Sequence, residues 1–291
     1  MAIWKKKKIG NSELEIRAKN MRPMFFFALL CAASALPAAE YVVLQTEEGK
    51  ETEIIAGDAK LAEKPVTPAS TFKIVLAWMG LELGVVDLET NRLCEDSHVP
   101  GTPREISLRQ ATFYSSNDYF VWLAKKIGPE KLRGHVQRSG FINGNLPDDW
   151  LEGGIESVVR AGKLKINARQ QHAFIQRVMH GKLTSDSAIR KKLLTCLAWP
   201  TNTSEILLYG KTGSYNRTVW FNGFGRKGKK WKAVTVLMVG NDAKRDKAIE
   251  LFYNQWGLKP GSLKIEDGTA NAAAAQPEAH PVHGKSRSRD P

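Results

Sequence analysis

A serine and a lysine three residues apart, Ser70 and Lys73, open an apolar stretch of the chain. Residues three apart lie on one face of a helix, so this spacing places the amine beside the hydroxyl. Pro68, just before the serine, suits the start of such a helix. A serine hydroxyl is a weak nucleophile until a base takes its proton. We therefore expect Ser70 to act as a nucleophile and Lys73 to act as its base.

Lys73 can serve as a base only if its pKa is lowered. A lysine with its ordinary pKa of about 10.4 is charged at neutral pH and cannot accept a proton. Burial lowers that pKa, and Ile74, Val75 and Trp78 are expected to supply an apolar wall. A neutral buried amine can also combine with CO2 to give a carbamate, which is itself a base. The sequence leaves both states of Lys73, amine and carbamate, open.

A second polar group follows at Ser115 and Asn117, immediately before a helical pattern. A hydroxyl at this point can relay a proton, and an amide two residues later can contact a substrate. The same residues also suit an N-cap or a turn, because their side chains bond readily to nearby backbone groups.

A third group, Lys211-Thr212-Gly213-Ser214, ends an apolar run that is typical of a strand. On the edge of a sheet, Lys211 and Thr212 are expected to face the carboxylate of a substrate. The backbone N–H groups of Ser214 and Ser70 are expected to form an oxyanion hole.

These groups, in this order, resemble the class D (oxacillinase-type) serine β-lactamases within the superfamily of penicillin-recognising serine acyl-enzymes. The resemblance rests on residues 68–73, 114–115, 153–155, 162–168, 208–213 and 220–224. It spans roughly residues 41–257 and implies a mixed α/β (α+β) fold of the β-lactamase/transpeptidase type. In that fold an antiparallel sheet of five to seven strands is flanked by helices and packs against an all-helical region.

The resemblance also assigns Arg245 to the carboxylate of the drug, since an arginine offers a bidentate fork to such a group. Without it, Arg245 reads as a solvated residue at the start of a helix. We expect Asn117, Thr212, Gly213, Ser214 and Arg245 to bind substrate, with Ser70, Lys73, Ser115 and Lys211 as catalytic residues.

The chain departs from the class D pattern at three places. Class D enzymes usually carry valine where this chain has Asn117, which is typical of penicillin-binding proteins and sensor domains. The Tyr-Gly-Asn element corresponds to residues 141–143, Phe-Ile-Asn. The tryptophan that holds a carbamylated lysine corresponds either to Trp150 or to Val159, depending on the alignment. These changes bear on release of the acyl group more than on its formation.

The resemblance therefore implies a serine β-lactamase that hydrolyses penicillin-type antibiotics through an acyl-enzyme at Ser70. Its partner is the small β-lactam substrate, and no metal or organic cofactor is expected. The alternative is a penicillin-binding sensor or a transpeptidase-like domain, which β-lactams acylate but which deacylates slowly. Oligomeric state is not predictable from the sequence.

The ends of the chain indicate export. Residues 21–39 combine a charged start, an apolar stretch and small residues, which is the pattern of a signal peptide. We expect a leader at 1–39, a catalytic domain at 40–261 and a disordered tail at 262–291, since the tail offers little to bury. The mature protein is then periplasmic or secreted, with no integral membrane span.

Composition excludes some other classes. The formal net charge is +13, of which residues 1–39 carry +5 from seven Lys and Arg against two Asp and Glu. The remaining +8 favours anionic ligands, and an exported protein has little access to nucleic acid. The six histidines lack the spacing of a zinc site. The glycine pattern at 223–228 resembles a dinucleotide loop but is expected to be a hairpin turn. Cys94 and Cys196 are open to a disulfide or to two separate thiols.

Periodicity places the elements that carry these groups. Helices are predicted at 70–84, 107–128 (as a pair), 129–140, 168–179, 186–199 and 245–256. Strands are predicted at 40–56 (as a hairpin), 205–209, 219–225 and 232–239.

Overall fold

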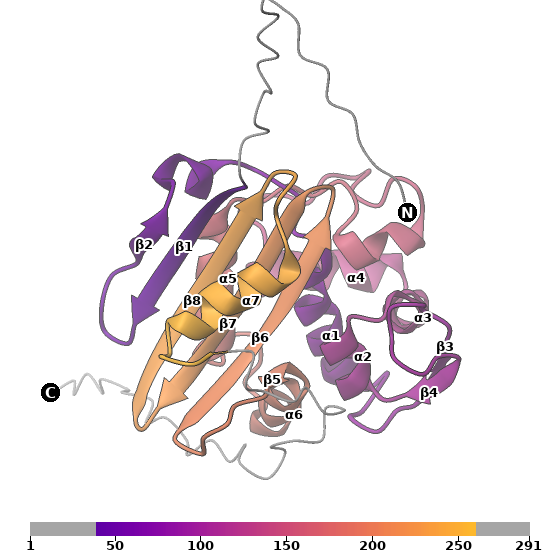
Figure 1. Cartoon of the computed structure of the whole chain (residues 1–291). Helices are drawn as coiled ribbons and strands as arrows, with labels where there is room; N and C mark the ends of the chain where they lie inside the picture. Colours follow the sequence, from indigo (N-terminus) through magenta and orange to yellow (C-terminus); the bar gives the residue numbers. More distant parts are fainter. Residues whose placement is uncertain (1–38, 260–291) are drawn as a thin grey trace, which may run out of the picture. The chain divides into compact units, whose positions relative to one another are not determined.

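The computed structural model describes residues 39–259 (Figure 1). The predicted signal peptide and the predicted tail from Ser262 lie outside the described residues. No helix between residues 39 and 259 is both long and apolar enough to cross a membrane.

The main sheet has six antiparallel strands in the order β2-β1-β8-β7-β6-β5, which confirms the predicted antiparallel sheet (Figure 1). The strands are β1 (Glu40–Glu47), β2 (Glu53–Gly57), β5 (Ala198–Trp199), β6 (Ile206–Tyr215), β7 (Thr218–Lys227) and β8 (Lys230–Val239). A separate short hairpin, β3 (Arg92–Cys94) with β4 (Arg104–Ile106), was not predicted.

The helices follow the predicted segments closely. The α-helices are α1 (Lys73–Glu82), α2 (Leu108–Tyr114), α3 (Asn117–Ile127), α4 (Pro129–Ser139), α5 (Ala168–Met179), α6 (Ser187–Leu197) and α7 (Arg245–Asn254). Three 3₁₀ segments accompany them: η1 (Ala59–Glu63), η2 (Ala69–Phe72) and η3 (Ile155–Arg160). Capping boxes start α2 at Ser107 and α5 at Asn167, since each side chain accepts from the N3 backbone while Gln at N3 bonds back.

Helices cover both faces of the sheet. On one face α7 packs against β7, where the rings of Phe252 and Phe221 stack with centroids 4.0 Å apart. On the other face lies α5, with the rest of the helical region beyond it (Figure 1). The central residues of β7 and β8 are buried on both faces, so neither strand alternates simply between apolar and polar residues.

Helix α1 runs through the centre of the helical region, and all its residues from Lys73 to Leu81 are buried. A helix that is apolar all round belongs inside a core. Phe72, just before it, packs edge-on against the rings of Phe141 and Trp150 at centroid distances of 5.2 Å and 5.9 Å. The start of α1 is therefore packed inside the core.

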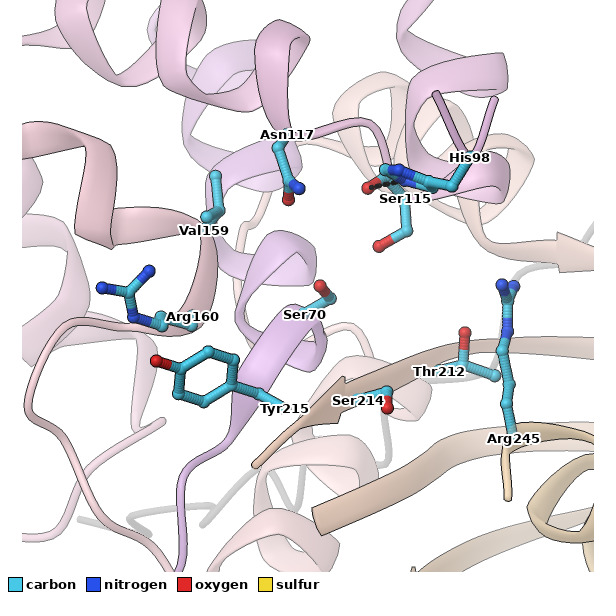
Figure 2. Close-up of a pocket in the computed structure, with 10 residues that line it drawn as sticks. All are labelled: Ser70, His98, Ser115, Asn117, Val159, Arg160, Thr212, Ser214, Tyr215 and Arg245. Atoms are coloured by element: carbon cyan, nitrogen blue, oxygen red, sulfur yellow. Dashed lines mark hydrogen bonds between the residues drawn. The ribbon is translucent and has the colours of Figure 1, made fainter. Parts of the chain in front are cut away.

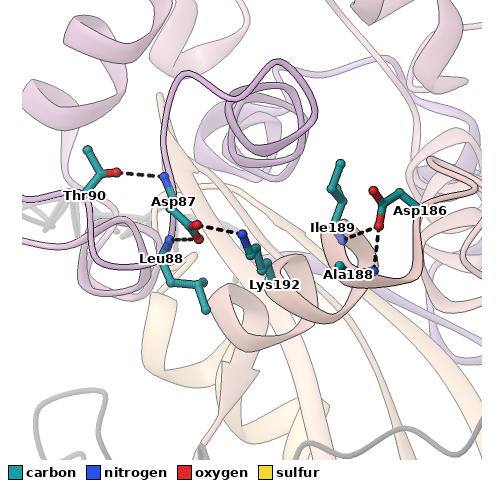
Figure 3. A network of polar contacts seen from close by, with 7 residues as sticks. All are labelled: Asp87, Leu88, Thr90, Asp186, Ala188, Ile189 and Lys192. Atoms are coloured by element: carbon teal, nitrogen blue, oxygen red, sulfur yellow. Dashed lines mark hydrogen bonds and ion pairs between the residues drawn. The ribbon is translucent and has the colours of Figure 1, made fainter.

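Polar contacts fix α6 beneath this region (Figure 3). The carboxylate of Asp186 accepts from the backbone N–H groups of Ala188 and Ile189, at 2.7 Å and 3.1 Å, and so caps the helix. Lys192 on the same helix forms an ion pair of 2.6 Å with Asp87, in the loop after α1. The predicted helix at 186–199 ends two residues early, because Ala198 and Trp199 pair with β6 instead.

The glycine pattern at 223–228 does belong to a hairpin, but only Gly228 lies in the turn, at φ 58°. Gly223 and Gly225 lie inside β7. A Cβ on Gly223 would come within 2.5 Å of the Tyr209 carbonyl oxygen, so the close strand approach requires glycine there. Cys94 and Cys196 are separate buried thiols.

Candidate active site

A cavity of about 300 Å³ lies between the start of α1, the α2–α3 junction, η3 and the open edge of β6 (Figure 2). Its lining residues are Ser70, His98, Ser115, Asn117, Val159, Arg160, Thr212, Ser214, Tyr215 and Arg245. Six of these were predicted site residues: five come from three motifs that are far apart in the sequence, and the sixth is Arg245. The lining contains two arginines and no carboxylate, so the cavity suits an anionic ligand.

Ser70 lies in η2, one turn before α1, and its hydroxyl points into the cavity (Figure 2). The residue before it, Ala69, is buried and has φ of 49°, a conformation that costs a residue with a Cβ about 1 kcal/mol or more. Such strain persists only where the surroundings enforce it. The position of Ser70 is therefore set by its neighbours rather than by local preference.

A buried chain of hydrogen bonds provides that enforcement. Thr71 donates to the Pro68 carbonyl oxygen at 2.6 Å and accepts from the Gln171 amide of α5 at 2.6 Å. Gln171 in turn accepts from the side-chain amide of Asn222 on β7. The turn that carries Ser70 is thereby tied to both α5 and the sheet.

Lys73 is fully buried beneath the cavity. Its Nζ donates to the Ser115 carbonyl oxygen at 2.6 Å, to Ser115 Oγ at 3.3 Å and to Asn117 Oδ1 at 2.8 Å. Burial lowers the pKa of Lys73 to about 7, while the charge of Asp96 opposes that shift and Arg245 adds to it. A lysine with this pKa is partly neutral at pH 7, which is the state that a general base requires.

Ser115 lies at the junction of α2 and α3. It closes α2 with φ of 65°, and the next residue, Ser116, caps α3 by accepting from the Tyr119 N–H. This sharp reversal directs the Ser115 side chain into the cavity and brings its carbonyl oxygen to Lys73 (Figure 2). The same sequence was open to an N-cap reading, and the structure shows both: Ser116 caps the helix while Ser115 faces the cavity.

The outer edge of β6 forms the opposite wall. Strand β5 pairs with β6 at Leu208 and Tyr209, and beyond that point β6 runs past η2. A Cβ on Gly213 would lie 3.0 Å from both the Pro68 carbonyl oxygen and the Thr71 nitrogen. Gly213 therefore acts by permitting strand and turn to approach, which places Thr212 and Ser214 in the cavity lining.

Lys211 was expected to face a substrate carboxylate. Its side chain is 1% exposed, is not among the residues that line the cavity, and donates to the Thr212 carbonyl oxygen at 2.9 Å. Successive side chains of a strand point to opposite faces, so Thr212 lines the cavity and Lys211 does not. Burial lowers the pKa of Lys211 well below its usual value, and the charges of Lys73 and Arg245 lower it further.

The two residues that could correspond to the family's tryptophan lie in different places. Val159 lines the cavity, whereas Trp150 packs against Phe72 in the core. Asn143, the asparagine of the segment aligned with the Tyr-Gly-Asn element, is exposed at the surface. Arg245, at the first turn of α7, lines the cavity as the resemblance implied.

Sequence reasoning missed three lining residues. His98 contacts the Ser115 carbonyl oxygen at 3.2 Å, although its sequence surroundings indicated only a surface histidine. Arg160 ends η3, and its guanidinium lies 5.0 Å from the centre of the Tyr215 ring. Only Tyr215 had a signal, because it directly follows the motif that ends at Ser214.

The arrangement can support acyl transfer. Two serines line one cavity together with two arginines, and a lysine of lowered pKa, bonded to the second serine, lies buried beneath it. These are the parts that a nucleophile, its base and a proton relay require.

Known proteins are similar to this chain in sequence and in fold. In β-lactamase OXA-10 of Pseudomonas aeruginosa, 30% of 162 residues are identical, covering 54% of this chain and 58% of that protein. The match thus spans less than two-thirds of that relative. A class D β-lactamase from Nostoc superposes with a TM-score of 0.65 at 23% identity, covering 76% of this chain and 95% of that one. One from Bacillus subtilis gives 0.64 at 22%, covering 76% and 92%.

These structural likenesses confirm the predicted fold. The sequence also matches the family model of the penicillin binding protein transpeptidase domain. The match covers residues 41–192, just over half of the chain. That stretch contains Ser70, Lys73, Ser115 and Asn117. The chain therefore belongs to the family of the penicillin binding protein transpeptidase domain.

Proposed function

We propose that this chain is a serine β-lactamase that hydrolyses the amide of penicillin-type antibiotics through an acyl-enzyme at Ser70. The observation that carries the proposal is the buried amine of Lys73, with its pKa near 7, bonded to Ser115 beneath the cavity that Ser70 lines. The two arginines of the lining suit the carboxylate that every penicillin bears. The names of the similar proteins support the same substrate class.

In the proposed first step, Ser70 Oγ bonds to the carbonyl carbon of the ring while neutral Lys73 takes its proton. The carbon–nitrogen bond of the ring then breaks, and the proton passes through Ser115 to the ring nitrogen. The backbone N–H groups of Ser70 and Ser214 stabilise the oxyanion that forms in between.

The ring carboxylate is held during this step by Thr212 and Arg245, which line the cavity together. Lys211 supports this contact through its hydrogen bond to the Thr212 carbonyl oxygen. This chemistry requires no cofactor beyond the side chains named.

In the second step a water molecule bonds to the acyl carbon while one of its protons passes to Lys73. The bond from that carbon to Ser70 Oγ then breaks, and Lys73 returns the proton to Ser70 Oγ. The rate of this step distinguishes a hydrolase from a sensor or a transpeptidase-like domain. It depends on whether Lys73 acts as a carbamate or as an amine.

Intact-mass spectrometry with benzylpenicillin tests the proposal. We expect a transient one-to-one adduct while penicilloate accumulates, and no adduct for Ser70→Ala. An adduct that persists without product would support the slowly deacylating alternative. If no adduct forms, or if Ser70→Ala forms one too, the proposed function is wrong.

We further propose that the catalytic domain at 40–261 acts in the periplasm or outside the cell, after removal of a signal peptide at about residues 21–39. The charged, apolar and small residues of that segment support this. Expression of the whole chain in a Gram-negative host, followed by intact mass of the periplasmic fraction, should give a protein that starts after Ala35 or Ala39. Recovery of the uncut chain in the cytoplasm alone would contradict export.

A further inference from the structure

Two arginines lie on opposite sides of Ser70 in the cavity: Arg160 on one side and Arg245 on the other (Figure 2). We infer that Arg160 and Tyr215 form a second anion subsite, and that the preferred β-lactams carry a carboxylate on the acyl side chain as well as on the ring. This inference rests on the proposed function and names its substrate class.

Arg160 is held in place without being neutralised. Its guanidinium lies 5.0 Å from the centre of the Tyr215 ring, an arrangement in which the ring face attracts the cation. A contact with the ring face leaves the N–H groups of the guanidinium able to bind an anion in a bidentate manner. Tyr215, which ends β6, is 39% exposed and stands at the same side of the cavity (Figure 2).

No carboxylate competes for Arg160 within residues 39–259. None lines the cavity, and the acidic residue of η3, Glu156, is already in an ion pair of 2.7 Å with Lys125 on α3. Arg160 likewise takes part in no ion pair within the described part of the chain. An arginine that lines a cavity and has no acidic partner within residues 39–259 can bind an external anion.

The geometry of a penicillin directs its side chain to this position. The ring carboxylate lies on the nitrogen side of the reacting carbonyl, and the acylamino side chain lies on the other side. With the ring carboxylate at Thr212 and Arg245 and the carbonyl at Ser70, the side chain points toward Arg160. Val159, next to Arg160 in the lining, offers an apolar contact for the aromatic part of such a side chain.

Three penicillins that differ only in the group attached to the side-chain α-carbon test this subsite. Carbenicillin carries a carboxylate there, benzylpenicillin carries none, and ampicillin carries an ammonium group. We expect the second-order rate constant of acylation to fall in that order for the unmodified chain. The advantage of carbenicillin should shrink as salt is raised, because the arginine is partly exposed to solvent.

Arg160→Gln removes the charge of the subsite. We expect it to slow acylation by carbenicillin about tenfold, the typical worth of one charge-assisted pair, while benzylpenicillin changes by less than about twofold. Tyr215→Leu should give a smaller loss for carbenicillin alone, because Arg160 loses its platform. Arg138→Gln, an exposed position on α4 outside the cavity, removes the same charge and serves as the control.

The outcomes separate this inference from the proposed function. Equal rates for the three penicillins, or an equal effect of Arg160→Gln on all three, would overturn the second subsite and leave the β-lactamase proposal intact. The comparison in the unmodified chain decides the matter even if Arg160→Gln fails to fold. Absence of an adduct with every penicillin would overturn the proposed function, and the subsite with it.

Discussion

The Nζ atom of Lys73 donates a hydrogen bond of 2.8 Å to the amide oxygen of Asn117. The lysine lies at the start of α1 and the asparagine at the start of α3, so this bond joins the two helices beneath the cavity. Asn117 stands at the position where class D enzymes usually have valine. An amide oxygen accepts from an amine or an ammonium group, whereas an apolar residue leaves the lysine nitrogen free to react with CO2.

Replacement of Asn117 should change the protonation of Lys73 in a direction set by the new side chain. Asn117→Asp places a negative charge beside the lysine, which raises the pKa of Lys73 and keeps it protonated at pH 7. We expect acylation by benzylpenicillin at pH 7 to slow about tenfold for each unit of that increase. Stopped-flow measurement of the acylation rate against pH gives both the pKa of Lys73 and the rate at pH 7.

Asn117→Val is the matched variant of opposite effect. It removes an acceptor of the charged amine, so the pKa of Lys73 should fall and carbamate formation should become easier. Intact mass in bicarbonate should then show the gain of one CO2, with faster deacylation. A valine variant that neither gains CO2 nor responds to bicarbonate would show that Asn117 does not control the state of Lys73.

The pH dependence of acylation in the unmodified chain follows from Lys73 as well. Burial places the pKa of Lys73 at about 7, and only the neutral amine can take the proton of Ser70. We expect the acylation rate to rise with pH through a midpoint near 7 and to level off above it. A rate that falls with rising pH over the same range would mean that the protonated lysine is the active form.

The sequence was sufficient for the parts of this site whose signal is local. Ser70 and Lys73 are three residues apart, and the helix that begins there is apolar throughout, so its central position in the core was predictable. The boundaries predicted for residues 168–179 are those of α5, because a capping residue, Asn167, and a clear amphipathic period define that helix.

Features that depend on how distant elements meet could not be predicted. The burial of Lys211 follows from the alternation of β6 relative to η2, which no pattern near residue 211 reveals. His98 and Arg160 lie in segments without a motif, and they reach the cavity only because the α2–α3 junction and η3 pack around Ser70. The strand predicted at 205–209 continues to Tyr215, because the residues after Tyr209 pair with β7.

The close approach of β6 to η2 is expected to matter both for the acylation rate and for the stability of the protein. Gly213→Ala adds a Cβ 3.0 Å from the Pro68 carbonyl oxygen and the Thr71 nitrogen, so the strand must move outward by a few tenths of an ångström. We expect acylation to slow about tenfold or more, since small displacements of catalytic groups are costly. Thermal unfolding should show a loss of roughly 1–3 kcal/mol.

Gly134→Ala is the control for this substitution. Gly134 lies inside α4, and a Cβ there meets only the end of the Arg138 side chain at 3.8 Å. Alanine favours the helix, so stability should rise by roughly 0.5–1 kcal/mol with acylation unchanged. If Gly213→Ala behaves like this control, the contact between β6 and η2 does not position the site.

The buried hydrogen bonds of Gln171 are expected to support both the stability of the fold and the position of Ser70. Gln171→Leu removes the donor to Thr71 and the acceptor for Asn222, both of which lie in the core away from water. A buried polar group left without its partner costs roughly 1–3 kcal/mol, so the unfolding free energy should fall by at least that amount. Acylation should slow as well, because the strained turn at Ala69 loses the bond that holds it to α5.

Gln137→Leu, the same change at an exposed position of α4, should alter stability by less than about 0.5 kcal/mol. Loss of stability without any change in the acylation rate would mean that Gln171 supports the core but does not position Ser70.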